Sequence, residues 1–187
     1  MYNNGSMLVY TIGHSTRELD DFVAILQQYK IQRLVDVRSV PRSRHTPQFN
    51  RETFGDVLKK HKIDYQHLGE LGGLRHAKKD STNTGWRNVS FRGYADYMQT
   101  KEFTHGIEEL LTLARDKTTA IMCAEAVPWR CHRSMIGDAL LVRDVEVIDI
   151  FDEHKAVNEK VTTFAQVRGT VITYPAYNDP ELAKGTV

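Results

Sequence analysis

Short apolar runs alternate along the chain with segments in which apolar residues recur every three or four positions. The first run covers residues 7–13 and ends in a glycine. The next segment places Leu19, Phe22, Val23 and Leu26 on one face of a helix, because residues three or four apart are neighbours on a helical surface. This order predicts a strand that leads directly into a helix.

A serine followed three positions later by a glutamate marks the expected start of that helix. Ser15 and Glu18 have the spacing of a capping box, in which the two side chains bond to the free N–H groups of the first turn. We therefore expect Ser15 to cap the helix.

The alternation continues to about residue 150. Further strands are expected around residues 34–37, from residue 63, and over 118–125 and 145–150, and further helices over 51–62, 91–115 and 132–143. Strands separated by helices pair in parallel through right-handed crossovers. The sequence therefore predicts an α/β fold, a three-layer α/β/α sandwich whose mostly parallel central sheet has about five strands.

One domain accounts for most of the 187 residues, because single domains commonly contain about 100–200 residues. Residues 7–187 are expected to form this single α/β domain, with a long loop near 69–89 and a loosely ordered C-terminal tail from residue 174. Residues 1–6 are expected to be a disordered leader or a cloning remnant.

Composition indicates where the protein is expected in the cell but says little about its binding partners. The 25 lysines and arginines nearly balance 24 acidic residues, so bulk charge favours no partner, although a local basic patch suffices for nucleic-acid binding. No apolar run reaches the length of a membrane span, and the N-terminal residues lack a secretory pattern. Two cysteines are too few for a disulfide scaffold, so we expect a cytoplasmic protein with reduced thiols and no membrane partner.

Most residues with reactive or charged side chains follow the expected strands. In open parallel sheets, ligands bind beyond the carboxyl ends of the strands. If the first, second and fourth strands are neighbours, one edge of the sheet collects three groups: Gly13, His14 and Ser15; Asp36, Arg38, Arg42, Ser43 and Arg44; and Cys123, Glu125, Arg130, Cys131, His132 and Arg133. A site is therefore expected at this edge.

The segment at residues 123–133 holds both cysteines and supports three interpretations. In the first, Cys131 is a nucleophile or redox thiol, because it precedes a helix whose N-terminal N–H groups lower the pKa of a thiol. In the second, Cys123, Cys131, His132 and His14 bind a metal ion, although no closely spaced ligand pair of the zinc-site type is present. In the third, the cysteines are buried core residues.

No cofactor is predicted, and a metal ion is the less favoured of these interpretations. A phosphate-binding loop in which a cysteine is followed, after five residues, by an arginine is absent. Six residues separate Cys123 from Arg130, and Gly137 occupies the corresponding place after Cys131.

Four motifs resemble a known family. TIGHS at 11–15, LVDVRSVPRSR at 34–44, YQHLGELGG at 65–73 and CAEAVPWRCHR at 123–133 are similar to motifs of the bacterial and archaeal family called domain of unknown function 488. The resemblance covers about residues 8–150 and implies a single α/β domain, but no reaction. Its family-typical positions are Gly13, His14, Ser15, Asp36, Arg38, Pro41, Ser43, Leu68, Gly69, Gly72, Gly73, Cys123, Glu125, Cys131, His132 and Arg133.

The collected groups favour an enzyme that binds a phosphorylated or other anionic substrate, such as a nucleotide or a nucleic-acid end. Guanidinium groups bind phosphate and carboxylate through paired hydrogen bonds, and histidine changes protonation near neutral pH. The predicted catalytic residues are Cys131, His132, His14, Glu125 and Cys123, with Glu125 orienting a histidine. The predicted substrate-binding residues are Gly13, Ser15, Asp36, Arg38, Arg42, Ser43 and Arg133. Residues 69–73 and 75–79 are expected to close over the substrate.

A non-catalytic module that binds nucleic acid or protein is the alternative. Its stacking surfaces and positive charges would come from exposed Trp86, Tyr94 and Tyr97 beside Arg75, Lys78, Lys79, Arg87 and Arg92. The sequence leaves the oligomeric state open.

Overall fold

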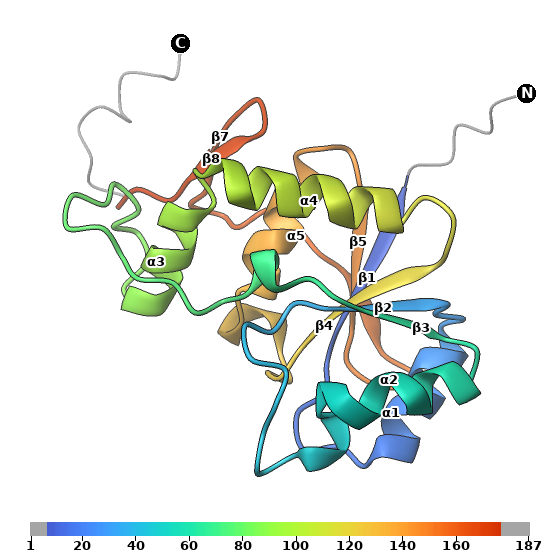
Figure 1. Ribbon diagram of the computed structural model, residues 1–187. Helices are drawn as coiled ribbons and strands as arrows, with labels where there is room; N and C mark the ends of the chain where they lie inside the picture. Colours follow the sequence, from blue (N-terminus) through green and yellow to red (C-terminus); the bar gives the residue numbers. More distant parts are fainter. Residues whose placement is uncertain (1–6, 177–187) are drawn as a thin grey trace, which may run out of the picture.

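One sheet runs through the middle of the molecule, and helices cover both of its faces (Figure 1). The computed structural model describes residues 7–176, so the expected leader at residues 1–6 lies outside the described residues. The six strands of the sheet are β1 Leu8–Gly13, β2 Arg33–Asp36, β3 Asp64–His67, β4 Thr119–Cys123, β5 Glu146–Ile150 and β6 Ala156–Asn158. Their order across the sheet is β3-β2-β4-β1-β5-β6.

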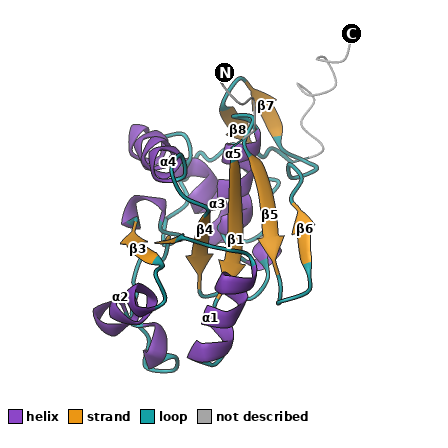
Figure 2. Cartoon of the chain, turned by 90° about the vertical axis from the view of Figure 1, so that its right-hand side faces the viewer, coloured by secondary structure: helices purple, strands orange, loops and turns teal. Residues whose placement is uncertain are grey.

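The pairing of the strands confirms the predicted fold class. Strands β1 to β5 pair in parallel, and β6 runs antiparallel to β5, at the outer edge of the sheet (Figure 2). The sheet has one strand more than the five that the sequence predicts, and this strand is β6. It is three residues long and exposed throughout, so it lacks the apolar run by which the other strands are predicted. A separate hairpin joins β7 (Gln166–Arg168) to β8 (Val171–Thr173).

The helices divide between the two faces of the sheet. Those among the described residues are α1 Leu19–Gln28, α2 Arg51–Lys60, α3 Val89–Tyr97, α4 Lys101–Leu113 and α5 Arg133–Leu141. Helices α1 and α2 cover one face, where Leu26 and Phe54 pack in one core with Ile12 of β1. Helices α3, α4 and α5 cover the other face, where Met135 of α5 shares a core with Ile121 of β4. Burying each such side chain contributes about 1.5–3 kcal/mol, so the apolar pattern produces the three layers.

Two expectations about helix boundaries are wrong. Helix α1 begins at Leu19 after Glu18, without a side-chain cap, and Ser15 has a φ of 49°. Ser15 therefore belongs to the turn after β1 and does not cap the helix. The single helical pattern over 91–115 is divided between α3 and α4, because the Thr100 hydroxyl accepts a hydrogen bond from the Phe103 N–H and starts a new helix.

The C-terminal segment is bound to the core at its start. The Tyr174 side chain is fully buried, and its hydroxyl donates to the Asp138 carboxylate at 2.7 Å. Its N–H donates to the Asn83 side chain at 2.8 Å. The expectation of a loose tail is therefore wrong for residues 174–176, and residues 177–187 lie outside the described range.

A buried carboxylate fixes much of the long segment between β3 and α3. Asp96, on α3, accepts hydrogen bonds from the Lys78 N–H at 2.8 Å, from the Ser81 hydroxyl at 2.6 Å and from the Asn83 amide at 2.8 Å. This segment is therefore packed onto the domain through α3.

Strands β2, β4 and β1 are consecutive neighbours, as the sequence argument required. Gly13 pairs with Cys123, and Asp36 pairs with Met122, so the three chain segments that leave these strands meet at one edge. None of the described helices is long and apolar enough to cross a membrane.

Candidate active site

The end of β2 carries a buried ion pair. The Arg38 guanidinium donates to the Asp36 carboxylate from Nε at 2.9 Å and from Nη2 at 2.6 Å, and the Tyr65 hydroxyl donates to the same carboxylate at 2.6 Å. Burial lowers the pKa of Arg38, but the hydrogen bonds and negative charge of Asp36 outweigh it and raise the pKa above its usual value. Asp36 therefore holds Arg38, and it does not line the cavity described below.

Most of the Arg38 donors are used inside the protein. Nη2 also donates to the Phe49 carbonyl at 2.8 Å, and Nη1 lies 3.2 Å from His14 Nε2. These bonds occupy four of the five N–H groups of a guanidinium. One N–H on Nη1 has no partner among residues 7–176, and Arg38 lines the cavity described below.

His14 is held by both ring nitrogens. Nδ1 donates to the Ser15 carbonyl at 2.8 Å, so Nε2 carries the lone pair that accepts from Arg38. The ring also stacks on Phe49 at 4.4 Å. Burial lowers the pKa of His14 to about 4, and the positive charge of Arg38 adds to this effect. The predicted acid–base residue His14 is therefore a neutral group that positions Arg38.

The turn after β1 fixes the loop after β4. His14 N–H donates to the Cys123 carbonyl at 3.0 Å, and Ser15 N–H donates to the Ala124 carbonyl at 2.9 Å. A Cβ at Gly13 would lie 1.7 Å from the Glu125 carbonyl oxygen, so only glycine permits this approach. Gly13 and Ser15 shape the edge of the site through their backbone.

Arg133 is the most deeply buried arginine at this edge, with 1% of its surface exposed. Its Nε lies 3.0 Å from Cys123 Sγ, its Nη1 donates to the Thr11 hydroxyl at 3.0 Å, and its Nη2 donates to the Glu125 carbonyl at 2.8 Å. Within the described chain it forms no ion pair with a carboxylate. The guanidinium therefore contacts sulfur through Nε, and the Thr11 hydroxyl links it to the Asp149 carboxylate at 2.5 Å.

Cys131 and His132 form a thiol–imidazole pair. Cys131 Sγ lies 3.5 Å from His132 Nδ1, and His132 Nε2 donates to the Val37 carbonyl at 3.0 Å. The Val37 bond leaves Nδ1 as the nitrogen that can accept the thiol proton. Burial lowers the pKa of His132, so its resting form is neutral.

The two thiols differ in their readiness to ionise. Burial raises the pKa of Cys131, but its hydrogen bond with Cys123 and the charge and backbone N–H of Arg133 outweigh burial and lower the pKa to about 7. Burial and the same hydrogen bond raise the pKa of Cys123 well above its usual range. Cys131 is therefore the thiol that ionises near neutral pH.

A cavity of about 400 Å³ opens beside these groups. Its lining comes from the loops after β2, β3 and β4 and from the start of α3: Arg38, Ser39, Val40, Gly73, Leu74, Ser90, Phe91, Tyr94, Cys123, Ala124, Glu125, Arg130, Cys131 and His132. Leu74 is 74% exposed and Val40 is 59% exposed. The cavity thus combines reactive and charged groups with apolar side chains.

The glycine-rich loop forms part of the wall. A Cβ at Gly73 would lie 2.4 Å from His132 Nδ1, and a Cβ at Gly72 would lie 2.5 Å from the Ser39 hydroxyl. Ser39 also accepts a hydrogen bond from the Leu74 N–H at 2.9 Å. Arg75 stacks on Tyr97 at 3.5 Å and donates to backbone carbonyls of the same loop. The loop that is expected to close over a substrate is packed against the site.

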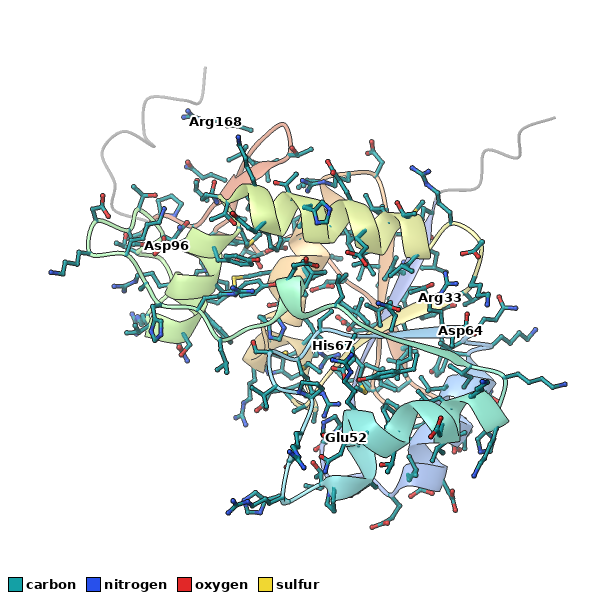
Figure 3. All side chains as sticks on the ribbon, viewed as in Figure 1. Arg33, Glu52, Asp64, His67, Asp96 and Arg168 are labelled. Carbon is teal, nitrogen blue, oxygen red and sulfur yellow. The ribbon has the colours of Figure 1, made fainter. Side chains whose placement is uncertain are left out.

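Two predicted substrate-binding residues lie elsewhere. Arg42 is 73% exposed and faces Glu52 of α2 at 3.6 Å; Glu52 is labelled in Figure 3. The Ser43 hydroxyl accepts hydrogen bonds from the His45 and Thr46 N–H groups, which shapes its own turn. Neither residue lines the cavity, so the expectation that they bind substrate there is not supported.

The expected role of Glu125 also differs from the structure. Its carbonyl oxygen accepts a hydrogen bond from Arg133, and its exposed side chain is at the cavity. The histidines are oriented by the carbonyl oxygens of Ser15 and Val37 instead. Sequence reasoning missed Val37 and Phe91, and no sequence signal marks a backbone carbonyl as the partner of an imidazole.

The aromatic residues of the alternative hypothesis are largely internal. Tyr94 is fully buried, and its hydroxyl donates to the Leu71 carbonyl. Trp86 packs against Phe91 at 5.1 Å and against Phe164 at 4.9 Å. The expectation of exposed stacking rings is therefore wrong for Tyr94 and unsupported for Trp86.

A group with metal-ligating atoms lies away from the cysteines. Glu70, His105 and Glu109 have ligand atoms within 4.8 Å of one another, and no group of three that includes Cys123, Cys131 or His132 occurs in residues 7–176. The metal interpretation of the cysteine segment therefore has no support from geometry.

Comparison with known proteins adds a family but no activity. The family model described as Domain of unknown function DUF488 matches residues 18–140. No curated protein and no solved structure matches the chain.

Proposed function

The chain belongs to the DUF488 family, a domain of unknown function, and we propose that it is an enzyme in which the Cys131 thiolate attacks an anionic or phosphorylated substrate. The reaction takes place in the cavity at the carboxyl edge of the sheet. Cys131 is the nucleophile, His132 is the proton acceptor, and Arg133 stabilises the negative charge on sulfur. Reduced thiols, as expected in the cytoplasm, are required.

The observation that carries the proposal is the environment of Arg133. A buried guanidinium is costly unless an opposite charge lies beside it. Its hydrogen-bond partners are Cys123, the Thr11 hydroxyl and backbone carbonyls, and its pKa is raised against the effect of burial by Cys123 and Cys131. The Asp149 carboxylate reaches this guanidinium only through the Thr11 hydroxyl, so a thiolate is the negative charge that suits the position directly beside Arg133.

The proton of Cys131 has a defined acceptor. His132 Nδ1 lies 3.5 Å from the sulfur, and a positioned imidazole activates a thiol by accepting its proton. The Val37 carbonyl stays bonded to Nε2 in the imidazolium that results. During attack, sulfur bonds to the electrophilic atom of the substrate, and the leaving group departs with the electron pair of the broken bond.

Positive and polar groups that can bind the substrate are available at the cavity. Arg130 is exposed and lines it, and Arg38 has one N–H left there. The backbone N–H groups of Ala124 and Glu125, which line the cavity, donate no hydrogen bond within the described chain. Such donors can stabilise an oxyanion. The exposed Leu74 and the partly buried Phe91 would contact an apolar portion of the substrate.

Competing alkylating reagents test this proposal. Iodoacetate is an anion and iodoacetamide is its neutral analogue, so a cationic cavity should raise the rate of Cys131 alkylation by iodoacetate relative to iodoacetamide. Inorganic phosphate should slow both reactions by occupying the anion site. The modified residue is identified by peptide mass spectrometry.

Arg130→Ala should reduce the preference for iodoacetate, whereas Arg168→Ala should not. Arg168 is an exposed arginine on β7, at the hairpin labelled in Figure 3. Equal rates for the two reagents in the wild type, with no protection by phosphate, would exclude an anionic substrate.

A further inference from the structure

The two cysteines line one cavity and share one positive neighbour. Cys123 ends β4 and Cys131 lies two residues before α5. Arg133 Nε lies 3.0 Å from Cys123 Sγ, and Cys131 Sγ lies 3.5 Å from His132 Nδ1. Two buried thiols that line one cavity beside the same cation are placed to form a sulfur–sulfur bond.

We propose that Cys131 reduces an organic hydroperoxide and that Cys123 resolves the oxidised sulfur by forming an internal disulfide. The proposal rests on the reactive Cys131 thiolate of the proposed function, but it does not require an anionic substrate.

The chemical steps balance with a hydroperoxide as oxidant. The Cys131 thiolate attacks the terminal peroxide oxygen, a sulfur–oxygen bond forms, and the oxygen–oxygen bond breaks. The released alkoxide takes the proton held by His132 and leaves as an alcohol. Cys131 is now a sulfenic acid, oxidised by two electrons, and the peroxide is reduced by two electrons.

The second step uses Cys123. Its sulfur attacks the Cys131 sulfur, the sulfur–sulfur bond forms, the sulfur–oxygen bond breaks, and the hydroxide leaves with the Cys123 proton as water. An external dithiol then restores both thiols through a mixed disulfide and becomes a disulfide itself. Arg133 can stabilise the thiolate of either cysteine during these exchanges, because its positive charge acts on both.

The loop between the cysteines can accommodate the bond. A disulfide brings the two Cβ atoms to about 3.5–4.5 Å. Residues 124–130 connect the cysteines, and the carbonyl oxygens of Ala124 and Glu125 are held by hydrogen bonds, so the movement that closes the bond falls on the residues between Glu125 and Cys131. The exposed apolar side chains of Val40 and Leu74 at the cavity favour a hydroperoxide with an apolar substituent.

The whole chain is suited to a direct test because it contains only two cysteines. The reduced protein is treated at pH 7 with stoichiometric cumene hydroperoxide or hydrogen peroxide, and free thiols are counted by maleimide labelling and intact mass. The proposal expects both thiols to be lost together, a mass lower by two hydrogens, and recovery with dithiothreitol. Cumene hydroperoxide should react faster than hydrogen peroxide.

The pKa of Cys131 sets the expected rate of its oxidation by the hydroperoxide. At pH 7 a thiol with a pKa of about 7 is about half ionised, against about one per cent for a thiol with the usual value of 9.0. The lower pKa also reduces nucleophilicity by about tenfold. Oxidation of Cys131 in the folded chain should therefore be about fivefold faster than in the same chain unfolded in guanidinium chloride.

Single variants separate the two roles. Cys123→Ser should accumulate a sulfenic acid at Cys131 that dimedone traps, and Cys131→Ser should leave Cys123 unreactive. Direct over-oxidation of Cys131 in the wild type, with Cys123 still free, would overturn the disulfide while leaving the proposed function intact. A Cys131 inert to both peroxide and alkylating reagents would overturn both.

Discussion

The imidazole of His132 bonds to the carbonyl oxygen of Val37 at 3.0 Å, and this contact joins the start of α5 to the end of β2, 95 residues earlier in the chain. It fixes which ring nitrogen faces Cys131, because the Nε2 proton is committed to the carbonyl. Neighbouring strands β2 and β4 bring the two chain segments together, so the parallel sheet itself orients the proton acceptor of the thiol.

Enlarging Gly73 should disturb this arrangement. In Gly73→Ala the new Cβ would lie 2.4 Å from His132 Nδ1, so either the loop or the imidazole must move. We expect a loss of about 1–3 kcal/mol in the free energy of unfolding and slower alkylation of Cys131. Urea denaturation and alkylation kinetics measure both.

Gly55→Ala is the matched control. Its Cβ would contact Tyr65 at an ordinary 3.4 Å, and alanine favours a helix over glycine by about 0.5–1 kcal/mol. Wild-type stability and alkylation in Gly73→Ala would show that the loop does not hold His132.

Removing the charge of Asp36 should be far more costly than removing an exposed one. Asp36 is fully buried and accepts three hydrogen bonds from Arg38 and one from Tyr65. Asp36→Asn leaves the guanidinium without its partner, so we expect a loss of about 3–5 kcal/mol.

Asp64→Asn provides the comparison in the same urea experiment. Asp64 is 50% exposed and pairs with Arg33 at 3.4 Å, as Figure 3 shows near the start of β3. We expect a loss of at most about 1 kcal/mol for this solvent-screened pair. Similar losses for the two variants would contradict the assigned role of Asp36.

Acid should destabilise the protein through His14. Burial and Arg38 lower the pKa of His14 from 6.5 to about 4, so between these pH values the unfolded chain binds more protons than the folded one. Stability is therefore lost as the pH falls from 6.5 to 4, by at most about 1.4 kcal/mol per pH unit. His14→Gln should flatten this part of the curve, and NMR of the wild type should show a neutral His14 ring at pH 5.5. A charged ring at that pH would refute the assignment.

Glu159 should have the opposite effect at higher pH. Burial and the nearby charges of Asp149 and Asp138 raise the pKa of Glu159 from 4.5 to about 9, and its Oε2 has no hydrogen-bond partner within residues 7–176. The folded chain binds the extra proton, so stability falls as the pH rises from 4.5 to 9.

The Glu159→Gln variant should therefore be more stable than the wild type, by a margin that grows with pH up to 9. The exposed Glu153→Gln should stay within about 0.5 kcal/mol of the wild type at every pH. Thermal unfolding at several pH values measures both. A constant difference between Glu159→Gln and the wild type would contradict the raised pKa.

The sequence alone predicts the three layers of the fold and the edge of the sheet at which the site lies. Apolar runs and helical periodicity predict β1, β2 and β4 with their helices, and the rule for parallel sheets then brings His14, Arg38 and Cys131 to one edge. Local periodicity carries this information because each element must bury one face.

The partners of each charged group depend on tertiary geometry instead. No pattern in the sequence indicates that Asp36 binds Arg38 while Arg42 remains exposed, or that Arg133 lies without a carboxylate. The turn at Ser15 was equally inaccessible, because its positive φ results from backbone bonds to the loop after β4. Tyr174 enters the core through contacts with Asp138 and Asn83, far from it in the chain.

The pH dependence of Cys131 alkylation by iodoacetamide tests the central claim most directly. In the folded wild-type chain, the rate at Cys131 should rise with a midpoint near pH 7, the pKa of its thiol, while Cys123 remains unmodified over the same range. Peptide mass spectrometry assigns each rate to its residue, and Cys131→Ser shows the background. A midpoint for Cys131 at or above the usual thiol value of 9.0, or faster modification of Cys123, would contradict the thiolate held by Arg133 and His132.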